Sequence, residues 1–307
     1  MYNWFFVNYR GFLLSCAKEI SNNKRRMRPS YTLQKEVSKK GVGVFTGEEA
    51  LLTLKPLPFG SGIVFQRTDL PGSPKFQLNL SLVKGTPRCT IIGNEIFSVQ
   101  TVEHLMAALH VYGIDDLLVQ LSGPEIPIFD GSAMPFVEMI EDAGLFPQGE
   151  KEIRELKTPV YWSCGDVHLV ALPAEECRIS YTLHYPSSSY IGTQFFSISL
   201  QQNSFKQEIA PCRTFSVYEE IAPLIEKGFL KGGSLESALV IKDNQVLNPE
   251  GLRLPEEMVR HKILDMIGDL YLMGFSFFAH IIAIRSGHHA NNAFANELLD
   301  QFKKESL

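Results

Sequence analysis

Three polar residues recur at intervals of four within residues 254–274. They are His261, Asp265 and Asp269, and apolar residues surround them. Side chains four positions apart lie above one another on one face of an α-helix, so the imidazole and the two carboxylates would be in register. Such a row indicates either a solvated stripe or half of a metal site. A solvated face usually carries Lys and Glu, so the rest of the chain must decide by supplying a further ligand.

That further ligand is available in the pair Glu103-His104, at the expected start of a helix. Alone, the pair would be read as a surface Glu beside a partly buried His. With His261 and Asp265, however, His104 gives three protein ligands and one open position, which is how catalytic zinc is held. Two His and one carboxylate also suit non-haem Fe(II). Asp269, one turn beyond Asp265, would then orient a His without binding the metal.

Two other clusters could complete the chemistry. Ser286-Gly287-His288-His289 follows an expected strand, and His288 there suits a general acid or an oxyanion stabiliser. The alternative is a surface turn, and spacing alone does not choose between His288 and His289. Arg213-Thr214-Phe215 precedes an apolar stretch that ends in Lys231-Gly232-Gly233-Ser234. It indicates either a buried part of the core or an apolar channel with Thr214 at its mouth. The remaining histidines are interpreted as structural: His110, His168, His184 and His280.

The elements that must position these residues predict an α+β fold. Strands and helices mix in both halves without regular βαβ units. We place a boundary in the polar segment 146–157, which gives domains 30–150 and 151–307. Thr101 is the expected N-cap of a helix over 102–112, and Ser132 caps the next helix. Strands are expected at 31–37, 50–57, 61–69, 75–83, 115–123, 159–163, 166–172, 177–185, 193–200 and 276–285, with a hairpin turning at Gly93-Asn94 and a last helix from about 290.

Composition excludes some classes of protein. The 307 residues carry a net charge of −5, which argues against a nucleic-acid-binding protein. The five cysteines are scattered without a C-x-x-C pair, as expected for reduced thiols in the cytoplasm. No run reaches the roughly 18–20 apolar residues that span a bilayer. In residues 1–26 the positive charges follow the apolar part, unlike a signal peptide, so we interpret residues 1–29 as an extension or as the product of a start codon upstream of Met27.

Taken together, these motifs resemble the UDP-3-O-acyl-N-acetylglucosamine deacetylases, the enzymes of the committed step of lipid A synthesis in Gram-negative bacteria. The shared motifs occur in the family's order from about residue 30 to the C-terminus. They are GVGVFTG (41–47), TVEHLMAAL (101–109), EIPIFDGSAMPF (125–136), RTF (213–215), LKGGS (230–234), VLNPEGLR, VRHKILDMIGD (259–269) and SGHHANN (286–292).

The resemblance implies two similar domains, each a β-sheet packed against helices, with the active site between them. It implies a zinc-dependent hydrolase of an amide C–N bond that releases acetate from the N-acetyl group of a UDP-linked acylated amino sugar. It also implies a cytoplasmic monomer without stable membrane insertion. Fe(II) in place of zinc stays open.

The resemblance further assigns individual roles. Metal ligation falls to His104, His261 and Asp265, and proton transfer to Glu103 as base and His288 as acid, which settles the choice against His289. Asp269 matches the carboxylate that pairs with this acid, Thr214 the hydroxyl that polarises the carbonyl, and Lys262 a cation at the site. An insert at about 214–242 would form a hydrophobic acyl passage. The substrate-binding residues implied are Phe215, Ile221, Leu230, Gly233, Ser234 and Arg285, the last near the nucleotide diphosphate.

One residue departs from the family pattern. Phe45 stands in GVGVFTG where the family usually has His, near the metal but not a ligand. This puts fine substrate positioning in doubt, and it keeps open a metal-dependent amidohydrolase acting on a different acylated amino sugar. A binding protein without activity is disfavoured because the metal and acid–base positions are all filled.

Overall fold

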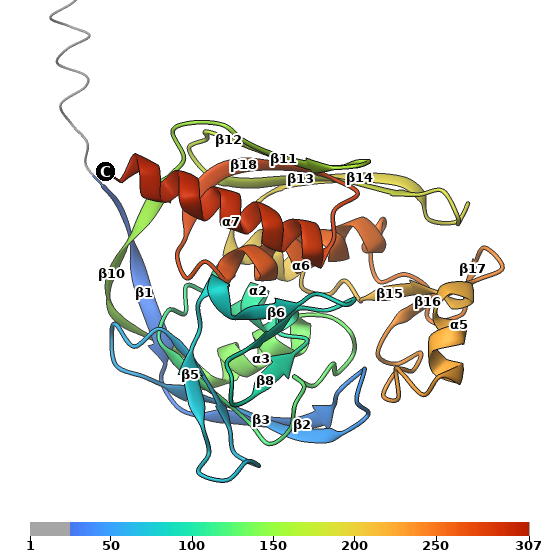
Figure 1. The fold of residues 1–307 in the computed structure, drawn as a ribbon, viewed down its shortest axis with the longest axis horizontal. Helices are drawn as coiled ribbons and strands as arrows, with labels where there is room; N and C mark the ends of the chain where they lie inside the picture. The colour runs from blue at the N-terminus through green and yellow to red at the C-terminus, as the bar shows by residue number, and fades with distance from the viewer. Residues whose placement is uncertain (1–24, 307) are drawn as a thin grey trace, which may run out of the picture.

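The protein, described here by a computed structural model over residues 25–306, is built from four stacked layers. In Figure 1 a sheet lies at the top, a second sheet lies at the bottom, and helices fill the space between them. Helices α6 and α7 pack against the upper sheet, and α2 and α3 belong to the lower half. These helices span Glu103–Val111 (α2), Met134–Ala143 (α3), Glu257–Tyr271 (α6) and His288–Glu305 (α7). The α+β fold class is therefore confirmed.

The lower half contains two sheets formed by residues 37–121. The larger has the order β2-β3-β9-β4-β5, and the smaller has the order β6-β7-β8. The strands are β2 (Val37–Val42), β3 (Glu49–Pro56), β4 (Ile63–Arg67), β5 (Lys75–Gln77), β6 (Val83–Gly85), β7 (Ile91–Gly93), β8 (Ser98–Gln100) and β9 (Leu117–Leu121), with the 3₁₀ helix η1 (Leu80–Leu82) after β5. The hairpin between β7 and β8 turns after Gly93, as expected.

The upper sheet is organised around strand β18 (Phe277–Ile284), whose alternate residues are buried. This period of two is the signature of a strand with one face against the core. Strand β18 pairs with β10, β12 and β13. The other strands of the sheet are β1 (Arg26–Leu33), β10 (Leu145–Glu155), β11 (Val160–Cys164), β12 (Val167–Leu172), β13 (Cys177–Tyr185) and β14 (Gly192–Ser199).

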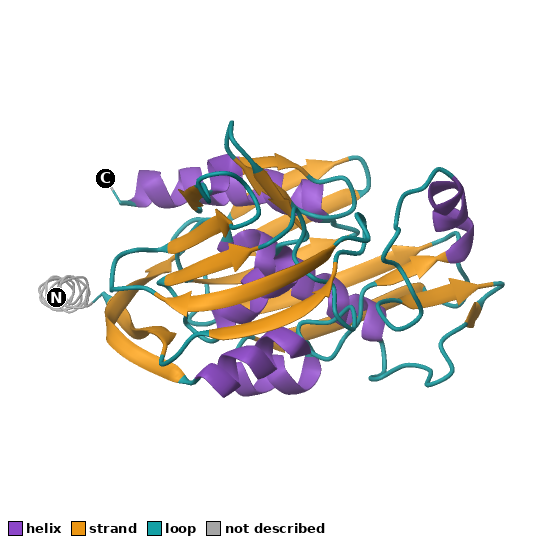
Figure 2. Ribbon diagram, turned by 90° about the horizontal axis from the view of Figure 1, so that it is seen from below, coloured by secondary structure: helices purple, strands orange, loops and turns teal. Residues whose placement is uncertain are grey.

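A small segment projects from this body at the right of Figure 1. It holds β15 (Phe215–Val217), α5 (Tyr218–Glu226), β16 (Leu239–Lys242) and β17 (Gln245–Val246), and it follows helix α4 (Gln202–Glu208). The three strands form a sheet of their own. Figure 2 shows the same segment extending away from the layered body. It coincides with the insert expected at about 214–242.

The segment expected to be a domain boundary, 146–157, is largely strand β10. It pairs antiparallel with β1 and parallel with β18, so one sheet contains strands from both halves of the chain. Residues 26–29, which we had assigned to the N-terminal extension, lie in β1. The division into domains 30–150 and 151–307 stays a prediction, and residues 1–24 lie outside the described range.

Three local expectations need correction. Thr101 is not the N-cap of α2, because its backbone is left-handed (φ 62°) and the cap position is occupied by Val102. Ala133 precedes α3, although Ser132 Oγ still accepts a bond from the backbone N–H of Met134 at 3.2 Å. Residues 75–83 form only a short strand before η1. Among residues 25–306, no helix has the length and apolar composition needed to cross a membrane.

Candidate active site

The helices that carry the expected metal ligands cross at Gly268. A Cβ atom at this position would lie 2.0 Å from the carbonyl oxygen of Glu103, so a side chain there would collide with the backbone of α2. Glycine therefore permits the close approach of α6 to the first turn of α2. Helix α6 is buried at every residue except Lys262, which leaves its polar row facing other protein groups.

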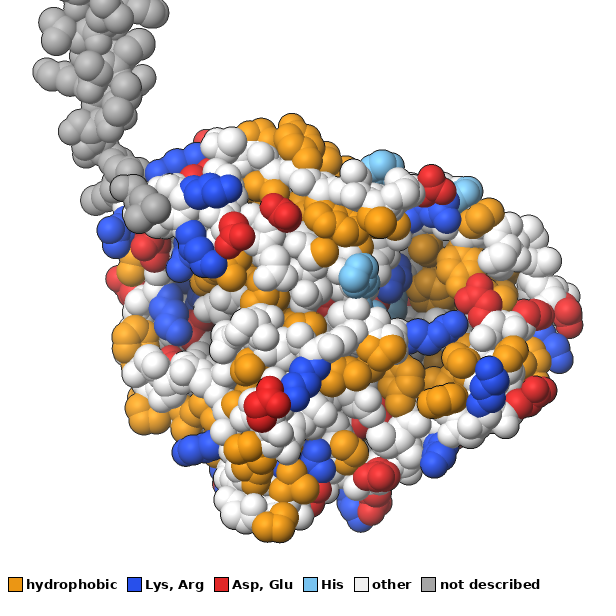
Figure 3. All heavy atoms as spheres, in the orientation of Figure 1, with side chains coloured by type: hydrophobic (Ala, Val, Ile, Leu, Met, Phe, Trp, Pro, Cys, Tyr) orange, Lys and Arg blue, Asp and Glu red, His pale blue; other side chains and the backbone are white. Residues whose placement is uncertain are grey.

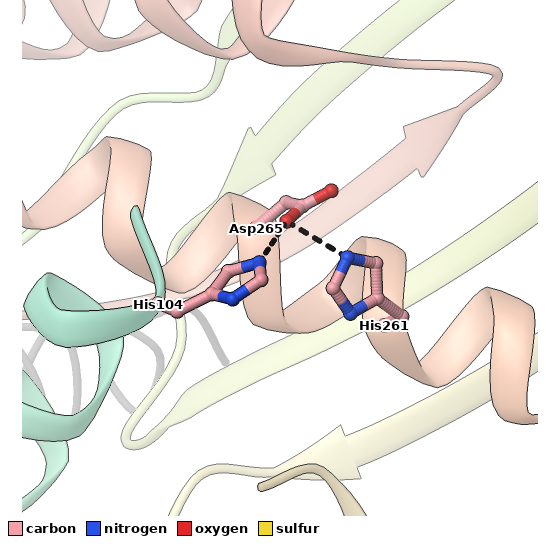
Figure 4. Close-up of side chains that lie close together, drawn as sticks. All are labelled: His104, His261 and Asp265. Carbon is pink, nitrogen blue, oxygen red and sulfur yellow. Dashed lines mark ion pairs between the residues drawn. The ribbon is translucent and has the colours of Figure 1, made fainter. Parts of the chain in front are cut away.

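This crossing brings His104, His261 and Asp265 together, as Figure 4 shows. Asp265 Oδ1 lies 3.3 Å from His261 Nε2 and 3.6 Å from His104 Nε2. One ligand atom from each residue lies within 4.8 Å of the others, and all three side chains are buried. The two imidazole rings meet edge to face at 5.0 Å. The three residues that the sequence grouped as ligands are therefore adjacent.

The hydrogen bonds of this cluster fit a cation. His261 Nδ1 lies 3.1 Å from the carbonyl oxygen of Cys212, which can only accept, so Nδ1 donates and Nε2 carries a lone pair. Burial lowers the pKa of His261 to about 3, which keeps the ring neutral. An imidazole lone pair then faces a carboxylate oxygen at 3.3 Å, and two acceptors at this distance favour a cation between them. The set provides three ligands of the kinds that zinc and iron(II) accept.

Lys262 lies beside this cluster and neutralises part of its charge. Its Nζ donates to Asp265 Oδ2 at 2.5 Å. Burial raises the pKa of the Asp265 carboxyl, but the neighbouring charges bring it well below its usual value. Burial lowers the pKa of the Lys262 ammonium, but Asp265 more than reverses this effect. Lys262 is thus charged in the pocket at neutral pH.

Glu103 and His288 form a second pair next to the cluster. Glu103 Oε1 lies 3.8 Å from His288 Nε2, and His288 Nδ1 lies 2.9 Å from Asp269 Oδ2. Burial raises the pKa of Glu103, an effect that His288 opposes. Burial lowers the pKa of His288, but Asp269, Asp265 and Glu103 raise it to about 9. The pair therefore joins a carboxyl group of raised basicity to an imidazole that is protonated at neutral pH.

All these groups face a pocket of about 690 Å³ except Asp269, which lies behind His288. The volume is within the range of small-molecule sites. The expected substrate residues Phe215, Ile221, Leu230, Gly233, Ser234 and Arg285 all line it. Figure 3 shows hydrophobic side chains gathered around the hollow on the right of the molecule, beside the β15–β17 segment. The pocket thus has a charged floor and largely apolar walls.

Thr214 is fixed in this wall by backbone bonds. Its N–H donates to the carbonyl oxygen of Gly131 at 2.8 Å. The preceding Arg213 is fully buried and donates from its backbone and its guanidinium to Glu257 at the start of α6. Thr214 is half-buried and lines the pocket.

Phe45 lines the pocket in the place where the family pattern has His. Its backbone N–H donates to Glu125 at 3.0 Å, and Thr46 donates to the same carboxylate through both N–H and Oγ1. Thr101 Oγ1 also donates to Glu125 at 3.0 Å. Glu125 thereby ties the turn that carries Phe45 to the residues before α2, and none of these bonds involves the Phe45 side chain.

Several residues around the site were not anticipated from the sequence. Glu125 belongs to the motif EIPIFDGSAMPF, in which an acid directly before Ile-Pro is the only sequence signal of its role. Arg88 and His184 line the pocket, although we had interpreted His184 as structural. Thr90 donates to Asp269 Oδ1 at 2.6 Å, and Asn291 donates to Oδ2 at 2.9 Å. Their partners are too distant in sequence for a local pattern to reveal.

The chain is similar to one family of known proteins over most of its length, and the matching relatives are deacetylases. The profile of LpxC: UDP-3-O-acyl N-acetylglycosamine deacetylase matches residues 30–300. A UDP-3-O-acyl-N-acetylglucosamine deacetylase of Chlamydia pneumoniae is 47% identical over 275 residues, covering 89% of this chain and 98% of the relative. Its counterpart in Chlamydia caviae is 47% identical with the same coverage. That of Chlamydia trachomatis serovar L2 is 44% identical and covers 91% and 97%.

Proposed function

The chain belongs to the UDP-3-O-acyl N-acetylglycosamine deacetylase family, and we propose that the residues of its pocket hydrolyse the N-acetyl group of UDP-3-O-acyl-N-acetylglucosamine. The products are acetate and UDP-3-O-acyl-glucosamine, in the committed step of lipid A synthesis. The assignment of roles rests on one observation, the position of the metal-ligand cluster beside an acid–base pair. His104, His261 and Asp265 adjoin an acid–base pair, Glu103 and His288, in one pocket.

The proposed metal ligands are His104, His261 and Asp265, and we propose zinc as the ion. A divalent ion held there would polarise the amide carbonyl and lower the pKa of water to about 7. The neutral His261 and the ionised Asp265 are already in the protonation states that metal binding requires. Because the same ligands also suit Fe(II), metal analysis of protein purified without added metal identifies the ion.

Glu103 is the proposed general base. One of its oxygens, Oε2, accepts a backbone N–H from Thr90 at 3.1 Å, and the other lies toward His288 and the pocket. The raised pKa of the buried carboxyl makes it a better proton acceptor at neutral pH. It takes a proton from the water molecule that adds to the acetyl carbonyl carbon.

His288 is the proposed general acid. Its imidazolium, which Asp269 holds through Nδ1, donates the Nε2 proton to the amine nitrogen as the C–N bond breaks. We further propose that the Thr214 hydroxyl donates to the carbonyl oxygen as negative charge develops, and that the Lys262 ammonium offsets that charge. An oriented donor of this kind is worth about 2.7–4 kcal/mol of barrier.

The walls of the pocket are the proposed substrate-binding surface. Phe215, Ile221 and Leu230 offer apolar area to the acyl chain, with Gly233 and Ser234 at the turn beside them. Arg285 has its guanidinium 3.3 Å from Asp166 and lines the pocket, where it would meet the diphosphate. The described cysteines Cys89, Cys164, Cys177 and Cys212 are free thiols, which supports a cytoplasmic location. We propose a monomer, which light scattering tests directly.

The test of this function is acetate release by the purified, metal-containing protein from UDP-3-O-acyl-N-acetylglucosamine. Two acyl chain lengths should both be deacetylated, with a preference set by the apolar walls. Absence of acetate from protein with bound metal would overturn the substrate assignment. Such a result would point instead to another acylated amino sugar, with Phe45 as the residue to examine first.

A further inference from the structure

Thr90 makes three hydrogen bonds beside the acid–base pair, and two of them reach Glu103 and Asp269. It is 1% exposed and immediately precedes β7, in the N-terminal half of the chain. Its backbone N–H donates to Glu103 Oε2 at 3.1 Å, and its hydroxyl donates to Asp269 Oδ1 at 2.6 Å. Its carbonyl oxygen accepts the N–H of Thr101 at 3.1 Å. One residue therefore contacts both the proposed base and the carboxylate that holds the proposed acid.

The Asp269 carboxylate depends on these donors for its orientation. Oδ2 accepts from His288 Nδ1 and from Asn291 Nδ2, both at 2.9 Å, and Oδ1 accepts from Thr90. Asn291 in turn accepts the Ser286 hydroxyl, so it is fixed on its own side. Without the Thr90 hydroxyl, no hydrogen bond in the described structure would hold Oδ1, and only the two bonds to Oδ2 would orient the carboxylate.

We propose that Thr90 is a positioning residue that sets the acid and the base in register across the junction of the two halves. It reaches Glu103 on α2 through its backbone and Asp269 on α6 through its side chain. Thr90 does not line the pocket, so it acts through these partners and touches no substrate. The inference rests on the proposed roles of Glu103, Asp269 and His288.

The chemistry gives this position a purpose. Glu103 removes a proton when water adds to the amide, and His288 delivers a proton when the C–N bond breaks. The distance between the two side chains must therefore suit one bound amide. The 3.8 Å between Glu103 Oε1 and His288 Nε2 is set by two different helices, α2 and the start of α7. Thr90 bonds to Glu103 directly and reaches His288 through Asp269 on α6, so it connects the two groups.

The test compares Thr90→Val with Thr90→Ser. Valine keeps the shape and the backbone bond but removes the hydroxyl, and we expect kcat to fall about 10- to 100-fold while KM changes less than about threefold. Serine restores the hydroxyl and should return kcat to within about threefold of wild type. A purely structural role would not be rescued selectively by the hydroxyl.

Thr32→Val is the matched control. Thr32 is 2% exposed and its hydroxyl donates at 2.6 Å to the Asp116 carbonyl oxygen, away from the pocket. The Thr32→Val variant should lose about as much thermal stability as Thr90→Val but keep the wild-type kcat. Metal content, measured on every variant, should stay at the wild-type level. Equal kcat for Thr90→Val and Thr32→Val, or failure of Thr90→Ser to recover, would overturn the proposal.

A double-mutant cycle tests whether the loss of kcat in Thr90→Val arises through Asp269. If Thr90 acts through Asp269, adding Thr90→Val to Asp269→Ala should cost less than about twofold in kcat. A full further 10- to 100-fold loss would show that Thr90 acts elsewhere. Glu103→Gln and His288→Ala are assayed in parallel. Full activity in those two variants would remove the proposed function itself, whereas their inactivity beside an unaffected Thr90→Val removes only this inference.

Discussion

Two regions share the wall of one pocket but are built differently. We call them the polar centre (Glu103, His104, His261, Asp265, Asp269 and His288) and the apolar segment (residues 215–247). Every side chain of the polar centre is buried or nearly so, and Asp265, Asp269 and His288 are each held by hydrogen bonds. The apolar segment instead leaves Ile225 and Phe229 about half exposed, at 48% and 56%.

The difference follows from the two kinds of recognition. A proton transfer needs atoms placed to within fractions of an ångström, and directional hydrogen bonds supply that placement. An acyl chain offers only area, and apolar burial is non-directional, at about 25 cal/mol per Å². Changes in the polar centre should therefore alter kcat, whereas changes in the apolar segment should alter KM and chain-length preference.

The largest effect is expected from Asp265→Ala, which removes the carboxylate shared by both imidazoles. We expect loss of bound metal and of measurable turnover, because two His alone leave the site short of ligands. Metal analysis and acetate release measured on the same preparation check this. Normal activity in a metal-free Asp265→Ala variant would show that turnover does not depend on the metal ligands of the polar centre.

Glu103→Gln should come next, since the amide keeps the shape but cannot accept the proton. We expect kcat to fall about 10²- to 10⁴-fold with metal content unchanged, as for loss of a general base. Steady-state kinetics beside metal analysis separates this variant from Asp265→Ala. Equal metal loss in both variants would mean that Glu103 is a ligand.

Asp269→Asn should have an intermediate effect that depends on pH. Asp269 is the strongest partner raising the pKa of His288, to about 9. The acid form of His288 is present below this pKa, so wild-type activity should decline as pH rises through about 9. In the variant this decline should move to lower pH, with a loss of about 10- to 100-fold above neutrality. Profiles of kcat against pH check the shift, and an unmoved alkaline limb would contradict it.

Ile221→Ala tests the apolar segment. The three removed carbons, at about 0.8 kcal/mol each, predict a loss of kcat/KM of up to about 60-fold for a long-chain substrate and little change for a short-chain one. Phe229→Ala is the control, because Phe229 is in the same segment but does not line the pocket. A loss in kcat alone, equal for both chain lengths, would contradict a role of the apolar segment in binding the acyl chain.

Phe45→His should have the smallest effect. The turn is held to Glu125 by backbone bonds and by Thr46, none of which the substitution touches. We expect KM to change less than about threefold and metal content to stay constant. A large gain in kcat would show that the residue at 45 takes part in the chemistry and would extend the polar centre by one member.

Residue spacing grouped the polar residues of the candidate site more readily than the residues that hold them in place. His261, Asp265 and Asp269 share one helix face, and local periodicity is what residue spacing reports. The polar segment 146–157 did not predict a strand, because the side chains of β10 are exposed or half-buried and mostly polar. Thr101 was taken for a cap because its residue type is typical, whereas its left-handed backbone aims the hydroxyl at Glu125. The bond from Thr90 to Asp269 links two parts of the chain that no local pattern relates.

The crossing at Gly268 has a consequence for folding. It places His104 and Asp265, which come from opposite halves of the chain, in one ligand set. An ion that binds this set but not the unfolded chain stabilises the native state by mass action, in proportion to the logarithm of its concentration over Kd. An ion bound there would thus also hold the N-terminal and C-terminal halves of the chain together. A chelator should then lower the temperature of unfolding of the whole chain in a single cooperative step.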